Sequence, residues 1–182
     1  MTDTETPETV CTLIPLADVD PASVEHVLDR AFGPGRFGRT AYKVRGDGEW
    51  LPGLSFAAID GDALIGTIQT WPVALTDPQG KPHPLLMVGP VAVIPERQRE
   101  GIGQALMLAM LEALDHPDLN GAAPLPQVLI GDAEYYGRFF GFSAEPTAGW
   151  TLPGPWEPHR LLVRAVNPAV LPREGMLGPW RA

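Results

Sequence analysis

The sequence predicts an α/β (α+β) fold built on a mixed, largely antiparallel central sheet that is flanked by helices. Segments 54–59 and 63–75 are strand-like and flank Asp60-Gly61, a dipeptide typical of hairpin turns. In the second half of the chain, apolar strand-like runs alternate with helical patterns, which is typical of helices packed on a sheet. With 182 residues, of which 45% are hydrophobic, the chain can form one domain with its own core.

The first half begins with a loosely alternating segment, 10–15, that we expect to be a strand. A helix should follow, because Asp20 is a good N-cap residue and Pro21 suits the first helical position. Residues 33–35, Gly-Pro-Gly, end this helix, and 39–44 is expected to form a second short helix. The apolar face of the first helix would consist of Val24, Val27, Leu28 and Ala31.

The second half contains a long expected strand, 85–94, that is interrupted by Gly89-Pro90. Because proline has no N–H to donate, we expect a bulge or a local separation from a neighbouring strand there. A helix over 104–116 and a short buried strand over 127–130 should follow. Asp132 is expected to cap a short helix, 133–140, that ends at Gly141, and 160–166 is expected to be the last strand.

The sequence predicts one folded domain with a segment of different character at each end. Residues 9–167 would form the domain, and the polar, acidic segment 1–8 would be a flexible N-terminus. The Pro- and Gly-rich segment 168–182 would be a C-terminal arm, and it is a candidate for packing on a second copy in a homodimer.

Composition excludes several classes of function. The net charge of -9 and the pI of about 4.8 disfavour nucleic acid as a partner and suit cationic or amine ligands. Cys11 is the single cysteine, so no internal disulfide forms and a reducing compartment is expected. The sequence has no Cys/His cluster with zinc spacing and no apolar run of membrane-spanning length, and its polar, acidic start is not expected to act as a signal peptide. We therefore expect a cytoplasmic protein with no metal and no membrane partner.

The most informative stretch is 89–107, in which an apolar strand leads into Gly101-Ile102-Gly103 at the start of a helix. The first N–H groups of a helix lack partners inside it, and the helix dipole adds positive character, so this turn suits an anion such as phosphate. Two glycines one residue apart are also compatible with a close-packed strand–helix turn. The dinucleotide-binding pattern would need a third glycine where Leu106 stands, and the Gly-Lys-Ser/Thr of a P-loop is absent.

These residues resemble the motif of the GCN5-related N-acetyltransferases, Gln/Arg-x-x-Gly-x-Gly/Ala, to which Gln98, Gly101 and Gly103 correspond. A second similarity lies in 131–142, GDAEYYGRFFGF, where a tyrosine on a short helix is followed by a Gly-Phe ending. This segment is most similar to the YYGRFGF-type motif of a bacterial branch of predicted small acetyltransferases, from which it differs by one additional phenylalanine. The resemblance covers roughly 10–166 and implies a sheet with splayed central strands.

The resemblance also implies acetyl-CoA as co-substrate. The backbone of Val91, Ala92 and Val93 would bind the pantetheine arm, and the N–H groups from Arg99 to Gln104 would bind the pyrophosphate. Arg97 and Arg99 would add charge outside the turn, or else they belong to a solvated turn without a binding role. Glu100 would contribute its N–H only. The expected coenzyme-binding residues are Val91, Ala92, Val93, Gln98, Arg99, Glu100, Gly101, Ile102, Gly103, Gln104, Asp132 and Tyr136.

The implied reaction is direct attack of a neutral primary amine on the thioester carbonyl. By the resemblance, the N–H near Val91 would stabilise the oxyanion and Tyr136 would protonate the leaving thiolate. The choice between Tyr135 and Tyr136 as the residue facing the sulfur stays open, and so does a structural role for both at the edge of the core. The ammonium proton would go to a water relay or to one of six side chains: Asp47, Glu49, His83, Asp132, Glu145 and His159.

The acceptor is expected to be a small-molecule amine bound by the loops 32–42 and 146–159. Their aromatic residues would form an apolar pocket or a cation–π wall, or else seal the core: Phe32, Phe37, Tyr42, Trp150 and Trp156. Two other functions stay open. One is acetylation of a protein lysine or N-terminus, and the other is a non-catalytic acyl-CoA-binding module, since 87–94 carries no carboxylate.

Overall fold

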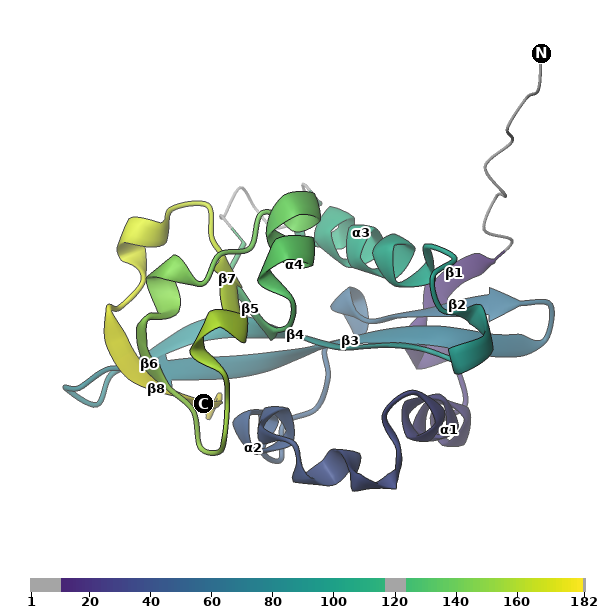
Figure 1. Ribbon diagram of the computed structural model, residues 1–182, viewed down its shortest axis with the longest axis horizontal. Helices are drawn as coiled ribbons and strands as arrows, with labels where there is room; N and C mark the ends of the chain where they lie inside the picture. Colours follow the sequence, from purple (N-terminus) through teal and green to yellow (C-terminus); the bar gives the residue numbers. More distant parts are fainter. Residues whose placement is uncertain (1–10, 117–123, 182) are drawn as a thin grey trace, which may run out of the picture.

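The computed structural model of the protein describes residues 11–116 and 124–181. The expected flexible N-terminus, 1–8, lies outside these residues. Within them, a sheet separates two layers of helices (Figure 1). Helices α1 (Pro21–Phe32) and α2 (Thr40–Arg45) cover one face, and α3 (Ile102–Leu114) and α4 (Ala133–Phe140) cover the other. The mixed, mostly antiparallel α/β class predicted from the sequence is confirmed.

The described residues contain eight strands in one sheet. The main path runs, in spatial order, through β1 (Thr12–Pro15), β2 (Phe56–Asp60), β3 (Ala63–Thr76), β4 (Pro82–Val93), β5 (Gln127–Ile130) and β7 (Leu161–Arg164). Neighbours on this path are antiparallel except β4 and β5, which are parallel. β3 is long enough for two partners on one edge: β2 pairs with its first half, and β8 (Glu174–Pro179) pairs with Val73–Thr76.

Local sequence signals set most element boundaries. The Asp20 side chain accepts a hydrogen bond from the Ala22 N–H (3.1 Å), and Pro21 opens α1. The hairpin at Asp60-Gly61 joins β2 to β3. Asp132 caps α4 by accepting from the Glu134 N–H (3.0 Å), and Gly141 ends that helix in the left-handed conformation, with φ of 76°.

Two strands were not predicted from the sequence. β6 (Gly149–Thr151) lies within the loop 146–158, and β8 lies within the stretch expected to be a C-terminal arm; the two pair in parallel. β6 has only three residues, and its backbone approaches the Arg173 carbonyl so closely that a Cβ on Gly149 would lie 2.3 Å from that oxygen. Glycine and proline in β8 lower its intrinsic strand propensity, so its conformation comes from pairing with β3.

The centre of the sheet splays at the break predicted in β4. The pairing of β3 with β4 shifts register between Ile68 and Thr70, opposite Gly89-Pro90, which confirms the expected bulge. β4 pairs with β5 only at Leu86 with Gln127 and at Met87 with Val128. The two strands therefore diverge before Val91 is reached.

The core lies on both faces of the sheet. The larger buried cluster joins α1 and α3 across β2, β3 and β4, and the smaller one lies under β5, β7 and β8. Trp150 belongs to the smaller cluster. It is 2% exposed, and its indole N–H donates to the Pro172 carbonyl (2.9 Å). Of the two roles that the sequence leaves open for Trp150, sealing the core is therefore the one observed.

Candidate active site

The turn between β4 and α3 has an unusual backbone. After the short 3-10 turn Pro95–Arg97, Arg99 has φ of 68° and Gly101 has φ of 83°, and Gly101 is the N-cap of α3. Glycine adopts this left-handed conformation without steric cost. α3 begins at Ile102, so the N–H groups of its first turn, which no helix can satisfy internally, belong to residues of the predicted anion site.

The charged side chains around this turn bind one another. Arg97 donates to Asp60 (2.6 Å) and to Glu100 (2.9 Å), and these hydrogen bonds raise the pKa of Arg97. The Gln98 side-chain amide donates to the Val93 carbonyl (3.2 Å). The Glu100 carboxylate is held by Arg97. The charge of Arg97 is therefore shared between two carboxylates.

The predicted pantetheine strand and the predicted phosphate turn lie side by side. A Cβ on Gly103 would meet Val91 Cγ1 at 3.6 Å and Val93 Cγ2 at 4.0 Å. Ala92 is fully buried and pairs with Thr67 of β3. Because β5 diverges from β4 before Val91, this edge of β4 is not covered by β5. The strand and the helix N-terminus thus meet beside an opening in the sheet.

A cavity of about 710 Å³ extends from this splay point, and we call it the cleft. Its walls come from the splayed strands, the start of α4, the α1–α2 region and the loop before β7. The lining residues are Phe32, Arg36, Gly38, Arg39, Thr40, Ala41, Tyr42, Arg45, Met87, Val88, Gly89, Pro90, Val91, Leu129, Ile130, Gly131, Asp132, Tyr136, Pro155, Trp156, Glu157 and Arg160.

Tyr136 lines the cleft, whereas Tyr135 is not among its lining residues. The Tyr136 ring packs against Gly131, which has no side chain, and a Cβ added at Gly131 would lie 2.5 Å from Tyr136 Cε2. Burial raises the pKa of Tyr136, so its phenol is a neutral hydrogen-bond donor at ordinary pH. Of the Phe139-Phe140 pair, Phe140 is buried and Phe139 is 51% exposed.

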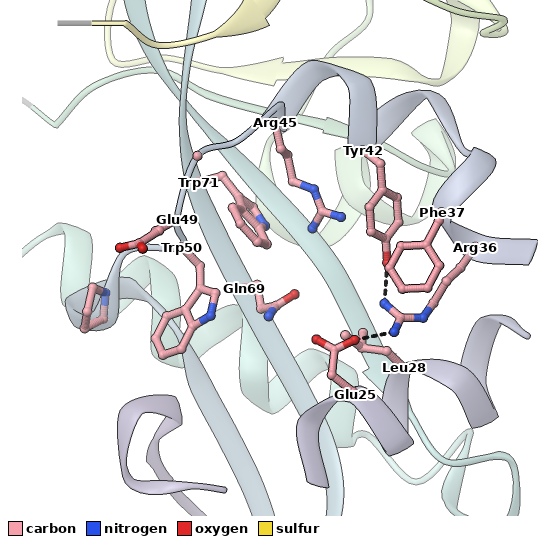
Figure 2. A pocket seen from close by; sticks show the side chains of 12 residues that line it. Glu25, Leu28, Arg36, Phe37, Tyr42, Arg45, Glu49, Trp50, Gln69 and Trp71 are labelled. Carbon is pink, nitrogen blue, oxygen red and sulfur yellow. Dashed lines mark hydrogen bonds and ion pairs between the residues drawn. The ribbon is translucent and has the colours of Figure 1, made fainter. Parts of the chain in front are cut away.

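A second cavity, of about 450 Å³, lies beside the cleft, and we call it the aromatic pocket (Figure 2). Arg36, Tyr42 and Arg45 line both cavities and separate them. The remaining lining residues come from α1, β3 and the segments 37–52: Glu25, Leu28, Phe37, Gly48, Glu49, Trp50, Pro52, Gln69 and Trp71.

The candidate bases fall in different places. Asp132 lines the cleft and Glu49 lines the aromatic pocket. His83 lies at the other end of β4, where its Nε2 is 2.9 Å from Asp77. Asp47, Glu145 and His159 are exposed and line neither cavity.

The sequence did not predict the three buried polar residues of the aromatic pocket, Arg36, Arg45 and Gln69, or its indole wall, Trp71. Arg45 lies at the end of a six-residue helix, and no spacing pattern connects it to β3. One signal was available, because Gln69 is a long polar side chain in a strand whose other residues are apolar residues, glycine, proline or threonine. The sequence-predicted aromatic residues of the loop 32–42 do lie at these cavities, since Phe37 and Tyr42 line the aromatic pocket and Phe32 and Tyr42 line the cleft.

The described part of the chain lacks two features. No helix there is long and apolar enough to cross a membrane. Residues 11–116 and 124–181 also contain no group of three or more His, Cys, Asp or Glu side chains able to hold a metal ion.

Comparison with solved structures defines the class of fold. The Escherichia coli GNAT family N-acetyltransferase YhbS, crystallised in complex with CoA, superposes with a TM-score of 0.69 over 99% of this chain and 93% of its own, at 22% identity. A GNAT family acetyltransferase from Brucella melitensis, crystallised with acetyl-CoA, superposes with a TM-score of 0.57 at 26% identity, covering 91% and 92% of the two chains. The splayed sheet is therefore the acetyltransferase fold.

The sequence places the chain in a family. The model of the acetyltransferase (GNAT) family matches residues 23–142, which is more than half of the chain. The chain belongs to the acetyltransferase (GNAT) family. A comparison with curated proteins gives no significant match.

Proposed function

We propose that the protein is an acetyl-CoA-dependent N-acetyltransferase that acetylates a primary amine of a small molecule. The observation that carries the proposal is a pair of adjoining cavities. The cleft lies at the splay point of β4 and β5, and a second, partly apolar cavity shares Arg36, Tyr42 and Arg45 with it. A transferase needs this arrangement, since donor and acceptor must meet at one point. The Brucella relative, which was crystallised with acetyl-CoA, supports the choice of donor.

Acetyl-CoA, the acetyl donor, would be bound by β4 and by the turn that opens α3. Val91, Ala92 and Val93 would pair with the pantetheine arm as an added strand, and the N–H groups of Arg99–Gln104 would bind the pyrophosphate. Two observations support the fit. A Cβ added at Gly103 would lie in van der Waals range of Val91 and Val93, and β5 diverges from β4 before this point.

The chemical step would be direct transfer. The amine nitrogen attacks the thioester carbonyl carbon, the C–S bond breaks, and the nitrogen loses a proton to water that relays it out of the cleft. The Val91 N–H would stabilise the developing oxyanion. The Tyr136 phenol would donate its proton to the departing thiolate and regain one from solvent. Burial raises the pKa of Tyr136, so this donor is protonated throughout the neutral range.

Calorimetry and a thiol-release assay test the proposal in two stages. Titration with acetyl-CoA should give a binding isotherm, and the absence of heat and of a thermal shift at millimolar ligand would refute the donor assignment. Thiol release should then appear with a panel of small primary amines. Turnover only with peptides or proteins would favour the lysine or N-terminal alternative, and binding without any turnover would favour the non-catalytic module.

A further inference from the structure

The aromatic pocket contains a buried guanidinium held between two rings. Arg45 is 4% exposed. Its Cζ lies 3.9 Å from the centroid of the Tyr42 ring and 4.1 Å from that of the Trp71 ring (Figure 2). Rings on both faces fix the plane of the guanidinium and leave its N–H donors directed outward from its edge.

Arg45 lacks the carboxylate partner that its neighbour has. Arg36 is equally buried but pairs with Glu25 and with Asp29 (2.9 Å). Among the described residues, no carboxylate forms an ion pair with Arg45. Burial lowers the pKa of Arg45, and the contact with Tyr42 and the charge of Glu25 oppose that shift. A buried cation that forms no direct ion pair is costly to maintain, and a bound anion would offset that cost.

A second buried polar group faces the same space. Gln69 is 4% exposed, lines the aromatic pocket, and its side-chain amide makes no hydrogen bond within the described residues. A planar guanidinium with an amide donor beside it matches the two oxygens of a carboxylate. Phe37, Trp50 and Trp71 supply the apolar part of the wall, and the carboxylates of Glu25, which pairs with Arg36, and of Glu49 also line the pocket.

The pocket is not suited to act as an aromatic cage for a cationic ligand. Tyr42 already stacks on Arg45, Phe37 lies 4.2 Å from the Arg36 guanidinium, and Trp71 covers the other face of Arg45. The rings that the sequence offers as a cation–π wall for an amine are therefore largely engaged by the protein's own arginines.

The pocket lies close to the splay point. Arg45 and Tyr42 line both cavities, and the Trp71 indole N–H donates to the Gly89 carbonyl (2.7 Å), next to Pro90 and Val91 of the cleft. A small molecule anchored by an anionic group at Arg45 would thus extend toward the cleft with its other end.

From this arrangement we propose that the acceptor is an amino-acid-like molecule. Its carboxylate would bind the Arg45 guanidinium and the Gln69 amide, its apolar side chain would pack on Trp50 and Phe37, and its primary amine would enter the cleft. The proposal rests on the N-acetyltransferase function proposed above and names the substrate class for that same site.

Matched pairs of amines test the carboxylate requirement. Thiol release is measured with L-phenylalanine against phenethylamine and with L-leucine against 3-methylbutylamine. Arg45→Gln should lower kcat/KM for the carboxylate-bearing member by about 10- to 100-fold and leave its decarboxylated partner within about twofold. Arg173→Gln, an exposed arginine outside both cavities, is the control. Because each amine is compared between wild type and variant, differences in amine basicity cancel.

Two outcomes overturn the proposal while leaving the acetyltransferase assignment intact. One is a wild-type enzyme that uses the decarboxylated amines as well as the amino acids. The other is an Arg45→Gln variant that loses activity equally on both members of each pair, which indicates a structural role. Retained acetyl-CoA binding shows that the Arg45→Gln variant is folded. If Arg45→Gln does not fold, Arg45→Lys, which keeps the charge but lacks the planar guanidinium, is tested in its place.

A binding measurement decides the anion site independently of turnover. 3-Phenylpropionate, a carboxylate without an amine, is titrated into the protein in the presence of CoA. Binding by wild type that is weakened at least about 10-fold in Arg45→Gln supports the site, and absence of binding by wild type refutes it. If no amine is acetylated at all, the proposed function fails, and this titration still reports on Arg45.

Discussion

Replacing Gly131 with alanine tests whether the position of the Tyr136 phenol matters to the reaction. The added Cβ would lie 2.5 Å from Tyr136 Cε2 and 2.9 Å from Cδ2, whereas ordinary contacts are 3.4 Å or longer, so the ring must move by about 1 Å. Gly131 does not need a left-handed conformation, so alanine strains the contact and not the backbone. A displacement of this size in a catalytic group costs about 100-fold in rate.

The assay is thiol release at saturating acetyl-CoA and amine, accompanied by calorimetry with acetyl-CoA. Gly131→Ala should lower kcat by about 10- to 100-fold with little change in thermal stability. Tyr136→Phe should lower kcat by about 100-fold or more through loss of the proton donor. Gly53→Ala is the matched control, because a Cβ there meets nothing within 4 Å.

The double variant decides between the two explanations of a rate loss. If Gly131 acts through the Tyr136 hydroxyl, Gly131→Ala should have little further effect in a Tyr136→Phe background, because coupled sites are not additive. Independent, additive losses would refute this reasoning, and so would a Gly131→Ala variant whose kcat stays within twofold of wild type.

Three further predictions concern the coenzyme turn, the core and the tyrosine. Gly103→Glu should weaken acetyl-CoA binding by about 100-fold or more in calorimetry, since it adds like charge at the phosphate site. It should leave the melting temperature unchanged, because an acidic residue suits a helix N-terminus, and Gly103→Ala should still bind. Leu106→Ala should lower the free energy of unfolding by about 2–5 kcal/mol in urea, whereas Leu108→Ala, 53% exposed on the same helix, should change it by less than about 0.5 kcal/mol. Because burial raises the pKa of Tyr136 above its usual 10.0, its contribution to stability is present below pH 10 and is lost as the pH rises through the folded-state pKa. In urea titrations on either side of pH 10, the free energy of unfolding should therefore fall less steeply with rising pH for Tyr136→Phe than for wild type. The same pH dependence in both proteins would contradict the burial of the Tyr136 phenol.

The sequence predicts features whose causes are local. Asp20 and Asp132 act as caps and Asp60-Gly61 forms a hairpin turn, because each depends on a few neighbouring residues. The proposed donor site is predicted from the same kind of local signal. Its strand and its turn are contiguous in the chain, and the structure brings Gly103 beside Val91.

The acceptor side could not be predicted in this way. Arg45, Gln69 and Trp71 come from a short helix and a long strand, and only the packing of α2 against β3 brings them together. Sequence patterns also could not distinguish an aromatic residue that lines a cavity from one that seals the core, as Trp156 and Trp150 illustrate. β8 was missed because its pairing partner, Val73–Thr76, is distant in the sequence.

The position of β8 has a consequence for how the protein folds. α2 rests on this strand, so closely that a Cβ on Gly46 would lie 2.5 Å from Pro179, and α2 carries Arg45. The aromatic pocket thus depends on closing the long loop between β3 and β8, which has a large entropic cost, whereas β4, its turn and α3 form from adjacent residues. During refolding, coenzyme binding should therefore appear before carboxylate binding. During partial unfolding, carboxylate binding should be lost before coenzyme binding.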